Sequence, residues 1–390
     1  MRFTSIADAA VRKRRYPRVP SKRGMVLDSV RRRARLVLDQ TWDLCKEVAL
    51  ATEDTLDADW DPGNLLERLF STEFFDTLIL VTNAACKVFA AQPSVVEAKA
   101  PCRVFGDLHG QFRDFLLLFW AFGSPDVTHA PSFVFNGDFV DRGAHSLELI
   151  CVLFALKILL PEKIWLVRGN HEDRTMNRKY GFEEECHTKL GPVIGRKVFE
   201  GIQKAFDLLP LACVVERSAL VLHGGIGNGA WTLSDLRMVK RPLRESDLAE
   251  PEKDWLNDIM WSDPIEDDDS KVERIFGVHE SPRSSSRLRV SRFAWNITKA
   301  FCARNGLSLI VRSHQAKKNG RGFDIMHDEM LVRVFSARDY ERNGNDGAVL
   351  LISRDAESSE KLLEVRPQVL RSLTKAKRTA SKTSAAARSS

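Results

Sequence analysis

Three short, glycine-flanked clusters contain the residue types that bind metals and phosphate. Their sequences are Gly-Asp-Leu-His-Gly at residues 106–110, Gly-Asp-Phe-Val-Asp-Arg-Gly at 137–143 and Gly-Asn-His-Glu at 169–172. Each follows an apolar run, as expected if the clusters meet at the ends of neighbouring strands. Carboxylate, imidazole and amide ligands together suit manganese, iron or zinc better than calcium or magnesium. The pattern therefore predicts a pair of divalent metals and the hydrolysis of phosphate esters.

The elements that would position these clusters alternate along the chain. Short β-prone runs occur at residues 102–105, 133–135, 164–167, 220–222 and 309–311, and helical periodicity occurs at 112–122, 146–160 and 193–206. This alternation predicts an α/β fold. His223, in His-Gly-Gly, and His314, in Arg-Ser-His-Gln, follow two further β-prone runs. Residues 330–335 and 348–352 are predicted to be additional strands that pair as antiparallel neighbours.

Charge is distributed unevenly along the 390 residues. The net charge is +6, but residues 1–35 carry +10, residues 366–390 carry +7, and the intervening body carries −11. We expect a disordered basic segment at 1–24, a basic amphipathic helical segment at 25–54, a catalytic domain at 55–355, and a basic Ser/Ala-rich tail at 356–390 that is largely disordered.

Several classes of protein are disfavoured. The sequence contains no apolar run long enough to span a membrane, no signal-peptide pattern at the N-terminus, and no GxxxxGK[ST] loop of an ATPase or GTPase. No motif supports specific nucleic-acid binding. The seven cysteines have no CxxC spacing, which is typical of thiols in a reducing compartment and predicts a cytoplasmic or nuclear location.

Taken in order, the motifs resemble those of the phosphoprotein phosphatase family of metal-dependent Ser/Thr phosphatases over roughly residues 60–353. The motif sequences are most similar to those of the EF-hand, or retinal degeneration C, branch and its plant relatives, although the sequence shows no EF-hand. The resemblance implies a calcineurin-like metallophosphoesterase fold with a central β-sandwich of mixed sheets flanked by helices. It also implies two metal ions, with manganese expected in vitro and iron or zinc as alternatives.

The same resemblance implies roles for individual residues. Asp107, His109 and Asp138 would hold one metal, and Asp138, Asn170, His223 and His314 would hold the other. His171 would be the general acid, with Asp141 as its partner. Arg142, Arg287 and Tyr340 would bind the substrate phosphate.

Two segments depart from the family pattern. Leu288 follows Arg287 where the family has glycine, so Arg283 and Arg289 compete with Arg287 for its role. Around Tyr340, the usual proline, asparagine and cysteine are replaced by Arg338, Asp339 and Glu341.

We therefore expect a protein serine/threonine phosphatase that acts on phosphoproteins with hydroxide generated by the metal pair. A dinucleotide polyphosphate hydrolase, or another phosphoesterase on the same fold, is one alternative. A weakly active scaffold that binds partners through its basic tails is another. The helix predicted at residues 25–51 is expected to pack on the catalytic body, and capture by calmodulin or a regulatory subunit is the alternative.

Overall fold

The fold is built around two β-sheets that face each other. The computed structural model describes residues 22–51, 55–71, 74–125, 131–266, 275–285, 288–354 and 363–377. Apolar side chains from both sheets form a shared core, including Val104 and Val134 from one sheet and Val221 and Val311 from the other. The predicted central sandwich of mixed sheets is confirmed.

The first sheet has six strands in the order β1-β5-β6-β10-β12-β11. Parallel pairs join β1 to β5, β6 to β10 and β10 to β12, while β5–β6 and β11–β12 are antiparallel. The bounds are β1 Val95–Ala98, β5 Ala212–Val215, β6 Ala219–Val221, β10 Leu309–Arg312, β11 Phe323–Met326 and β12 Leu331–Val334.

The second sheet has five strands in the order β14-β13-β2-β3-β4, and the strands β2, β3 and β4 are parallel. The bounds are β2 Cys102–Phe105, β3 Ser132–Phe135, β4 Ile164–Leu166, β13 Gly347–Arg354 and β14 Leu363–Leu370. A small third sheet, in the order β7-β9-β8, contains β7 Asp263–Pro264, β8 Val278–Glu280 and β9 Ser291–Phe293.

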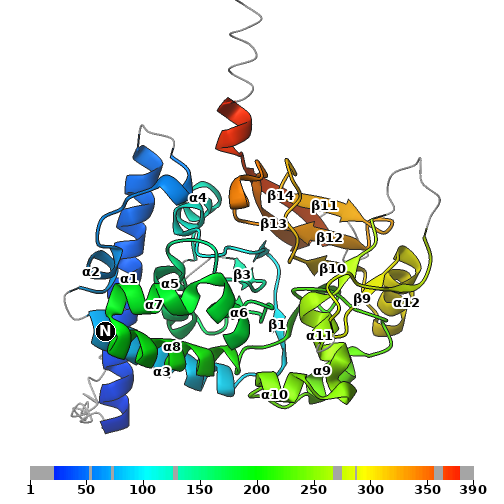
Figure 1. Cartoon of the computed structure of the whole chain (residues 1–390), viewed down its shortest axis with the longest axis horizontal. Coiled ribbons are helices and arrows are strands. Elements are labelled where there is room, and N and C mark those ends of the chain that lie inside the picture. The colour runs from blue at the N-terminus through cyan, green and yellow to red at the C-terminus, as the bar shows by residue number, and fades with distance from the viewer. Residues whose placement is uncertain are drawn as a thin grey trace, which may run out of the picture.

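Helices cover the outer face of each large sheet (Figure 1). One layer packs on Phe105, Phe133 and Phe135 of the second sheet, and the other packs on Leu220 and Ile310 of the first. The first layer includes α1 Lys22–Leu50, α2 Leu65–Phe70, α3 Phe74–Ala90, α4 Phe112–Phe122, α5 Ser146–Leu159, α7 Phe182–Leu190 and α8 Pro192–Phe206; the second includes α9 Leu233–Met238, α11 Asp254–Trp261 and α12 Trp295–Asn305.

The shorter elements are α6 Arg174–Tyr180, α10 Glu245–Leu248 and the 3-10 turns η1 Asp57–Asp59, η2 Pro251–Lys253 and η3 Tyr340–Arg342, and residues 373–377 form a further helical turn. Within the described residues, no helix is both long and apolar enough to cross a bilayer.

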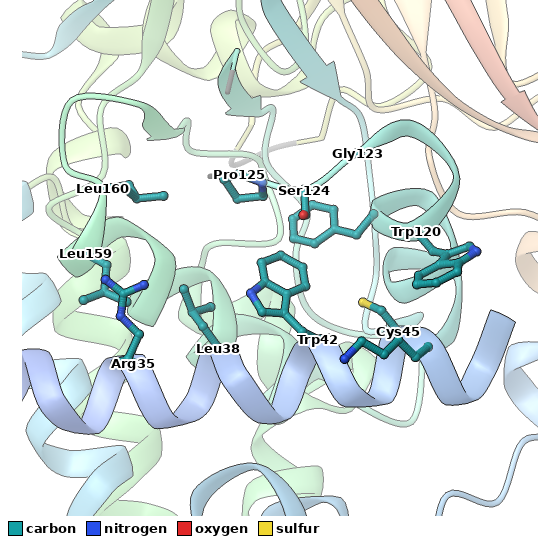
Figure 2. A pocket seen from close by; sticks show the side chains of 12 residues that line it. Arg35, Leu38, Trp42, Cys45, Trp120, Gly123, Ser124, Pro125, Leu159 and Leu160 are labelled. Atoms are coloured by element: carbon teal, nitrogen blue, oxygen red, sulfur yellow. The ribbon is translucent and has the colours of Figure 1, made fainter. Parts of the chain in front are cut away.

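Helix α1 packs on the catalytic body through its apolar face. Val30, Ala34, Val37 and Leu44 are buried in the core that α1 shares with α4 and α5. Beside this contact, Leu38 and Trp42 line a cavity of about 480 Å³, with Arg35 and Lys46 also in its wall; Figure 2 shows the α1 side chains directed into it. The Trp42 ring lies 5.7 Å from that of Phe119. The apolar stripe that suggested capture by a partner is therefore already covered by the body.

Two expectations from the sequence were wrong. β12 and β13 do not pair with each other: β12 belongs to the first sheet, whereas β13 pairs with β2 and β14 in the second. In addition, the folded part continues beyond residue 355, because β14 forms eight antiparallel pairings with β13 in a segment expected to be a disordered tail. Residues 1–21 and 378–390 of the predicted basic segments lie outside the described residues.

Candidate metal centre and active site

The predicted ligands meet where strands of both sheets end. Asp107 and His109 follow β2, Asp138 follows β3, and Asn170 follows β4. His223 and His314 follow β6 and β10 of the other sheet. The backbone of Asp107 also bridges to Phe335, just after β12, which joins the ends of the two sheets.

The glycines in the clusters allow the loops to approach one another closely. Gly137 has a positive φ of +82°, and a Cβ at Gly169 would collide with the carboxylate of Asp138. The backbone N–H of His109 donates to the carbonyl of Asp138 at 2.9 Å, and that of Gly110 donates to Phe139 at 2.9 Å. His109, Asp138 and His314 also have positive φ values. Such strained backbone is stabilised only by surrounding contacts and is common at functional sites.

One half of the cluster contains Asp107, His109 and Asp138. The His109 Nε2 atom lies 3.6 Å from a carboxylate oxygen of Asp107 and 3.6 Å from one of Asp138. The other ring nitrogen of His109 lies 3.0 Å from the carbonyl of Val140, which fixes the ring. The Nε2 atom of this imidazole is therefore directed at the two carboxylates.

The other half is centred on His223. Its Nε2 atom lies 2.9 Å from Asn170 Oδ1, 3.3 Å from Asp138 Oδ2 and 3.3 Å from His314 Nδ1. Its Nδ1 atom lies 2.7 Å from the carbonyl of Asn136 and is the nitrogen that would carry the ring proton. Asp138 is shared by both halves.

This donor set fits a cation pair. In the second half, two oxygen and two ring-nitrogen atoms, all possible hydrogen-bond acceptors, converge on one another. A single proton placed among them cannot bond to all four. Asp138, His223 and His314 offer ligand atoms that lie within 4.8 Å of one another, and so do His109, Asp138 and His171. All of these side chains are buried. Buried carboxylates and imidazoles so arranged are typical of metal ligands.

The local charges favour the same conclusion. Burial opposes protonation of His109 and His223, but the carboxylates beside them outweigh it and raise the pKa values to about 9 and about 8. Negative charge that attracts a proton also attracts a metal ion. By contrast, burial and then the positive charge of Arg283 hold the pKa of His314 well below its usual range, leaving it neutral as a ligand must be.

His171 lies beside this cluster, with its ring held by a carboxylate. Its Nδ1 atom lies 2.7 Å from Asp141 Oδ2. The same oxygen accepts a hydrogen bond from Asn177 at 2.8 Å, and the Asn177 amide also donates to the carbonyl of His171 at 2.7 Å. The Asp141 carboxylate thus orients the imidazole and leaves its Nε2 directed into the site.

The comparisons with known proteins agree with this geometry. The family model of the calcineurin-like phosphoesterases matches residues 101–318, more than half of the chain. The chain belongs to the calcineurin-like phosphoesterase family. The serine/threonine-protein phosphatase BSL2 of Arabidopsis thaliana is 37% identical to it over 294 residues, which cover 74% of this chain and 28% of BSL2. The chain therefore spans little more than a quarter of the length of that curated relative.

A solved structure gives the same result. It is a protein serine/threonine phosphatase from Saccharomyces cerevisiae with similarity to human phosphatase PP5, and it is 32% identical to this phosphoesterase with a TM-score of 0.63. The match covers 75% of this chain and 89% of that chain. These findings confirm the predicted calcineurin-like fold and membership of the phosphoprotein phosphatase family.

Two of the three residues predicted to bind phosphate, Arg142 and Tyr340, lie in the described part of this phosphoesterase. Arg142 lies over the ring of Tyr180 at 4.0 Å, and its Nη1 atom donates to Glu341 at 2.7 Å. The Tyr340 ring stacks on His109 at 4.9 Å. Burial, followed by the charge of Glu341, raises the pKa of Tyr340 well above its usual value, so its hydroxyl stays protonated. Both residues line the mouth of the site.

Arg287 lies outside the described residues. Among the described arginines of that segment, Arg283 is linked to the site: its Nε donates to Asp263 Oδ2 at 2.6 Å, and its charge affects His314. Arg312 donates to the other carboxylate oxygen of Asp263 at 2.9 Å. Arg289 is exposed and lines a different cavity.

Sequence reasoning missed three supporting residues of the phosphoesterase site. Glu172 is fully buried and accepts hydrogen bonds from the backbone N–H groups of Asp138, Phe139 and Gly169 at 2.7–2.9 Å. Asn177 fixes Asp141, and Gln203 on α8 donates to Asn177 Oδ1 at 2.7 Å. Only Glu172 carried a signal, since it belongs to the Gly-Asn-His-Glu cluster.

Proposed function

We propose that this phosphoesterase hydrolyses phosphoserine and phosphothreonine esters in proteins. The observation that carries the proposal is the His171–Asp141 pair, at 2.7 Å, beside six buried ligand side chains. The ligands could hold metals in many phosphoesterases. The oriented imidazole adds a proton donor for the alkoxide of a departing serine or threonine, whose unassisted departure is slow.

The residues divide the work as follows. Asp107, His109 and Asp138 would hold one cation, and Asp138, Asn170, His223 and His314 the other. When bound, such a pair activates water and neutralises phosphate charge. Manganese, iron and zinc all suit the mixed oxygen and nitrogen donors. His171 protonates the leaving oxygen, and Asp141 keeps its imidazole oriented.

Arg142 contributes a planar guanidinium for the phosphate oxygens, at the mouth of the site. For the second arginine we favour Arg283, because its contact with Asp263 and its effect on His314 put its charge near the second half of the cluster. Tyr340 stacks on His109 and lines the same cavity as Arg142.

The deciding experiment compares substrates with the purified full chain in the presence of Mn²⁺. We expect phosphate release from phosphoserine and phosphothreonine peptides, and much slower hydrolysis of a dinucleotide polyphosphate. Activity on the dinucleotide alone would replace our choice with the second phosphoesterase class. Inactivity on every substrate, with both metals bound, would favour the scaffold alternative.

We also propose the partners and the cellular location of the protein. Phosphoprotein substrates follow from the proposed activity. A calmodulin partner for α1 has little support, because the apolar face that it would grip is buried against α4 and α5. A regulatory subunit bound elsewhere is compatible with the fold. All seven cysteines are unpaired thiols, which supports a reducing compartment, the cytoplasm or the nucleus.

A further inference from the structure

The arginine expected to grip phosphate already has a carboxylate partner from its own chain. Glu341 Oε1 accepts a hydrogen bond from Arg142 Nη1 at 2.7 Å, and the two side chains are 48% and 34% exposed. Arg142 is also stacked on Tyr180 at 4.0 Å, which restricts rotation of its planar group. The Nη1 group of the guanidinium is thus already bonded to a carboxylate.

The pair lies at the mouth of the site. Arg142 and Glu341 line a cavity of about 240 Å³ together with His109 and Tyr340. Two other carboxylates in this lining have structural partners, since Asp57 accepts from the backbone of Arg113 at 2.8 Å and Asp339 binds residues after β14. Glu341 is the carboxylate of the lining that faces the phosphate-binding arginine.

The loop that carries Glu341 has a strained backbone. Asp339, Glu341 and Arg342 all have positive φ values, between 46° and 61°. Non-glycine residues avoid this region unless other contacts hold them there. Part of the restraint is local, because Asn345 accepts from the backbone N–H of Tyr340 at 2.9 Å and donates to the carbonyl of Ala337 at 2.7 Å.

The rest of the restraint comes from a helical turn and the two residues before it, at residues 371–377 just after β14. Asp339 accepts from the Ser372 hydroxyl at 2.6 Å and from the backbone N–H of Leu373 at 2.8 Å. Asp346 accepts from the backbone N–H of Ser372 at 2.7 Å and from Lys375 Nζ at 2.9 Å. Both ends of the loop are therefore fastened to the same turn. Asp339 and Glu341 are also two of the positions at which the sequence departs from the family pattern.

We propose that Glu341 is an internal competitor of the substrate phosphate for Arg142, held in place by the turn at residues 371–377. The inference rests on the proposed phosphatase function, because it takes Arg142 as a phosphate ligand. A phosphate dianion that takes both N–H groups on one edge of the guanidinium must displace the Glu341 carboxylate, since two anions on one cation repel each other. Glu341 therefore weakens the binding of free phosphate and of weakly held small phosphomonoesters.

The test measures binding of inorganic phosphate to the full chain loaded with Mn²⁺, by isothermal titration calorimetry. Glu341→Gln keeps the size of the side chain and removes its charge. We expect this variant to bind phosphate roughly 3- to 10-fold more tightly, as expected for loss of a partly exposed ion pair and of one repulsive charge. Glu364→Gln is the matched control, because it removes the charge of another exposed ion pair, with Arg366 on β14. The control should bind phosphate as the wild type does.

The role of the turn is tested by Ser372→Ala, alone and combined with Glu341→Gln. If the turn acts by presenting Glu341, Ser372→Ala tightens phosphate binding in the wild type by a smaller factor, and it has no further effect in Glu341→Gln. An equal weakening in both backgrounds would assign the turn a purely structural role. Unchanged or weaker phosphate binding by Glu341→Gln would overturn the inference itself.

This readout is separate from the proposed function, because binding of phosphate requires no turnover. If the protein is inert toward phosphopeptides but binds phosphate more tightly after Glu341→Gln, the proposed activity is wrong and the role of Glu341 as a competitor is supported. If the protein hydrolyses phosphopeptides but Glu341→Gln does not tighten phosphate binding, the proposed activity is supported and the role of Glu341 as a competitor is wrong.

Discussion

The ligand cluster and the mouth of the site are built by different means. Each ligand comes directly after a buried strand, is at most 9% exposed and is fixed by hydrogen bonds within the same group of loops. The mouth includes side chains such as Arg142 and Glu341, which are about one-third to one-half exposed. The loop that carries Glu341 is bonded to Ser372, far along the chain, through Asp339. The cluster is thus buried at the ends of strands from both sheets, whereas the mouth is partly exposed and one of its loops is fastened to residues after β14.

The comparison suggests how chemistry and selectivity separate in this molecule. The strand ends carry the residues expected for metal binding and proton transfer, in the order that the family pattern predicts. Three of the departures from that pattern, at Arg338, Asp339 and Glu341, line the mouth, and none of them is a predicted metal ligand. Mutations in the two regions should therefore differ in size and in kind.

The largest effect is expected for Asp138→Asn, at the centre of the cluster. Asp138 lies within 3.6 Å of His109 and 3.3 Å of His223, and its other oxygen accepts from the backbone of His171. A neutral amide cannot serve both halves. We expect loss of bound metal and a fall in turnover on the order of 10³-fold or more. Metal analysis and phosphopeptide hydrolysis measure both, with the exposed Asp76→Asn as control. Full metal content with wild-type turnover would show that the Asp138 carboxylate is needed neither to bind the metals nor for the reaction.

His171→Asn should separate the proton donor from the ligands. The side chain of His171 lies close enough to His109 and Asp138 to be counted with them as a metal-binding group. As a general acid, its loss should lower kcat by about 10²- to 10⁴-fold while both metals stay bound. Loss of metal in this variant would instead make His171 a ligand. Metal content is thus the decisive measurement, and the rate alone is not.

The strands and the ligand positions could be predicted for the same physical reason. A buried strand has a short apolar sequence with a clear end, and a parallel sheet gathers such ends at one edge. β2, β3 and β10 were found within one residue in this way. The fold that assembles them, and the division of ligands between two metals, came from the family resemblance instead.

What the sequence did not reveal depends on contacts between distant segments. β12 and β13 are adjacent in sequence, but the chain passes from one sheet to the other between them. The β-propensity of a segment does not indicate which sheet it joins. β14 was missed because it contains Pro367 and precedes a Ser/Lys-rich tail, although a proline is tolerated on such an edge strand. Gln203 reaches Asn177 from a helix 26 residues away.

A smaller effect on turnover is expected at Asn177, which supports the cluster without being a ligand. Asn177→Ala removes one of the donors to Asp141 and loosens His171, so kcat should fall by about 10-fold, with little change in KM or in metal content. Gln203→Leu, one step further from His171, should give a smaller fall in the same direction. A rise in KM with kcat unchanged would mean instead that Asn177 acts on substrate binding at the mouth. Steady-state kinetics with a phosphopeptide distinguishes these outcomes.

The smallest change is expected at His145, next to the mouth, and concerns stability. Unlike His109 and His223, His145 forms no ion pair with a carboxylate among the described residues, although the charge of Asp61 favours its protonation. Its ring nitrogens are buried without a hydrogen-bond partner in the same part of the chain, and its ring packs against Trp60 at 5.5 Å. Burial, and then the charge of Lys189, lower its pKa from 6.5 to about 4.

Between these two values the unfolded chain binds a proton that the folded chain does not. The free energy of unfolding should therefore decrease as the pH falls from 6.5 toward 4 and be insensitive to this group above pH 6.5. His145→Phe keeps the ring and removes the titration. We expect it to gain about 1–2 kcal/mol relative to the wild type between pH 8 and pH 5, measured by urea unfolding. The exposed His279→Gln should show no such gain, and equal pH dependence of wild type and His145→Phe would mean that His145 becomes protonated in the folded protein as easily as in the unfolded chain.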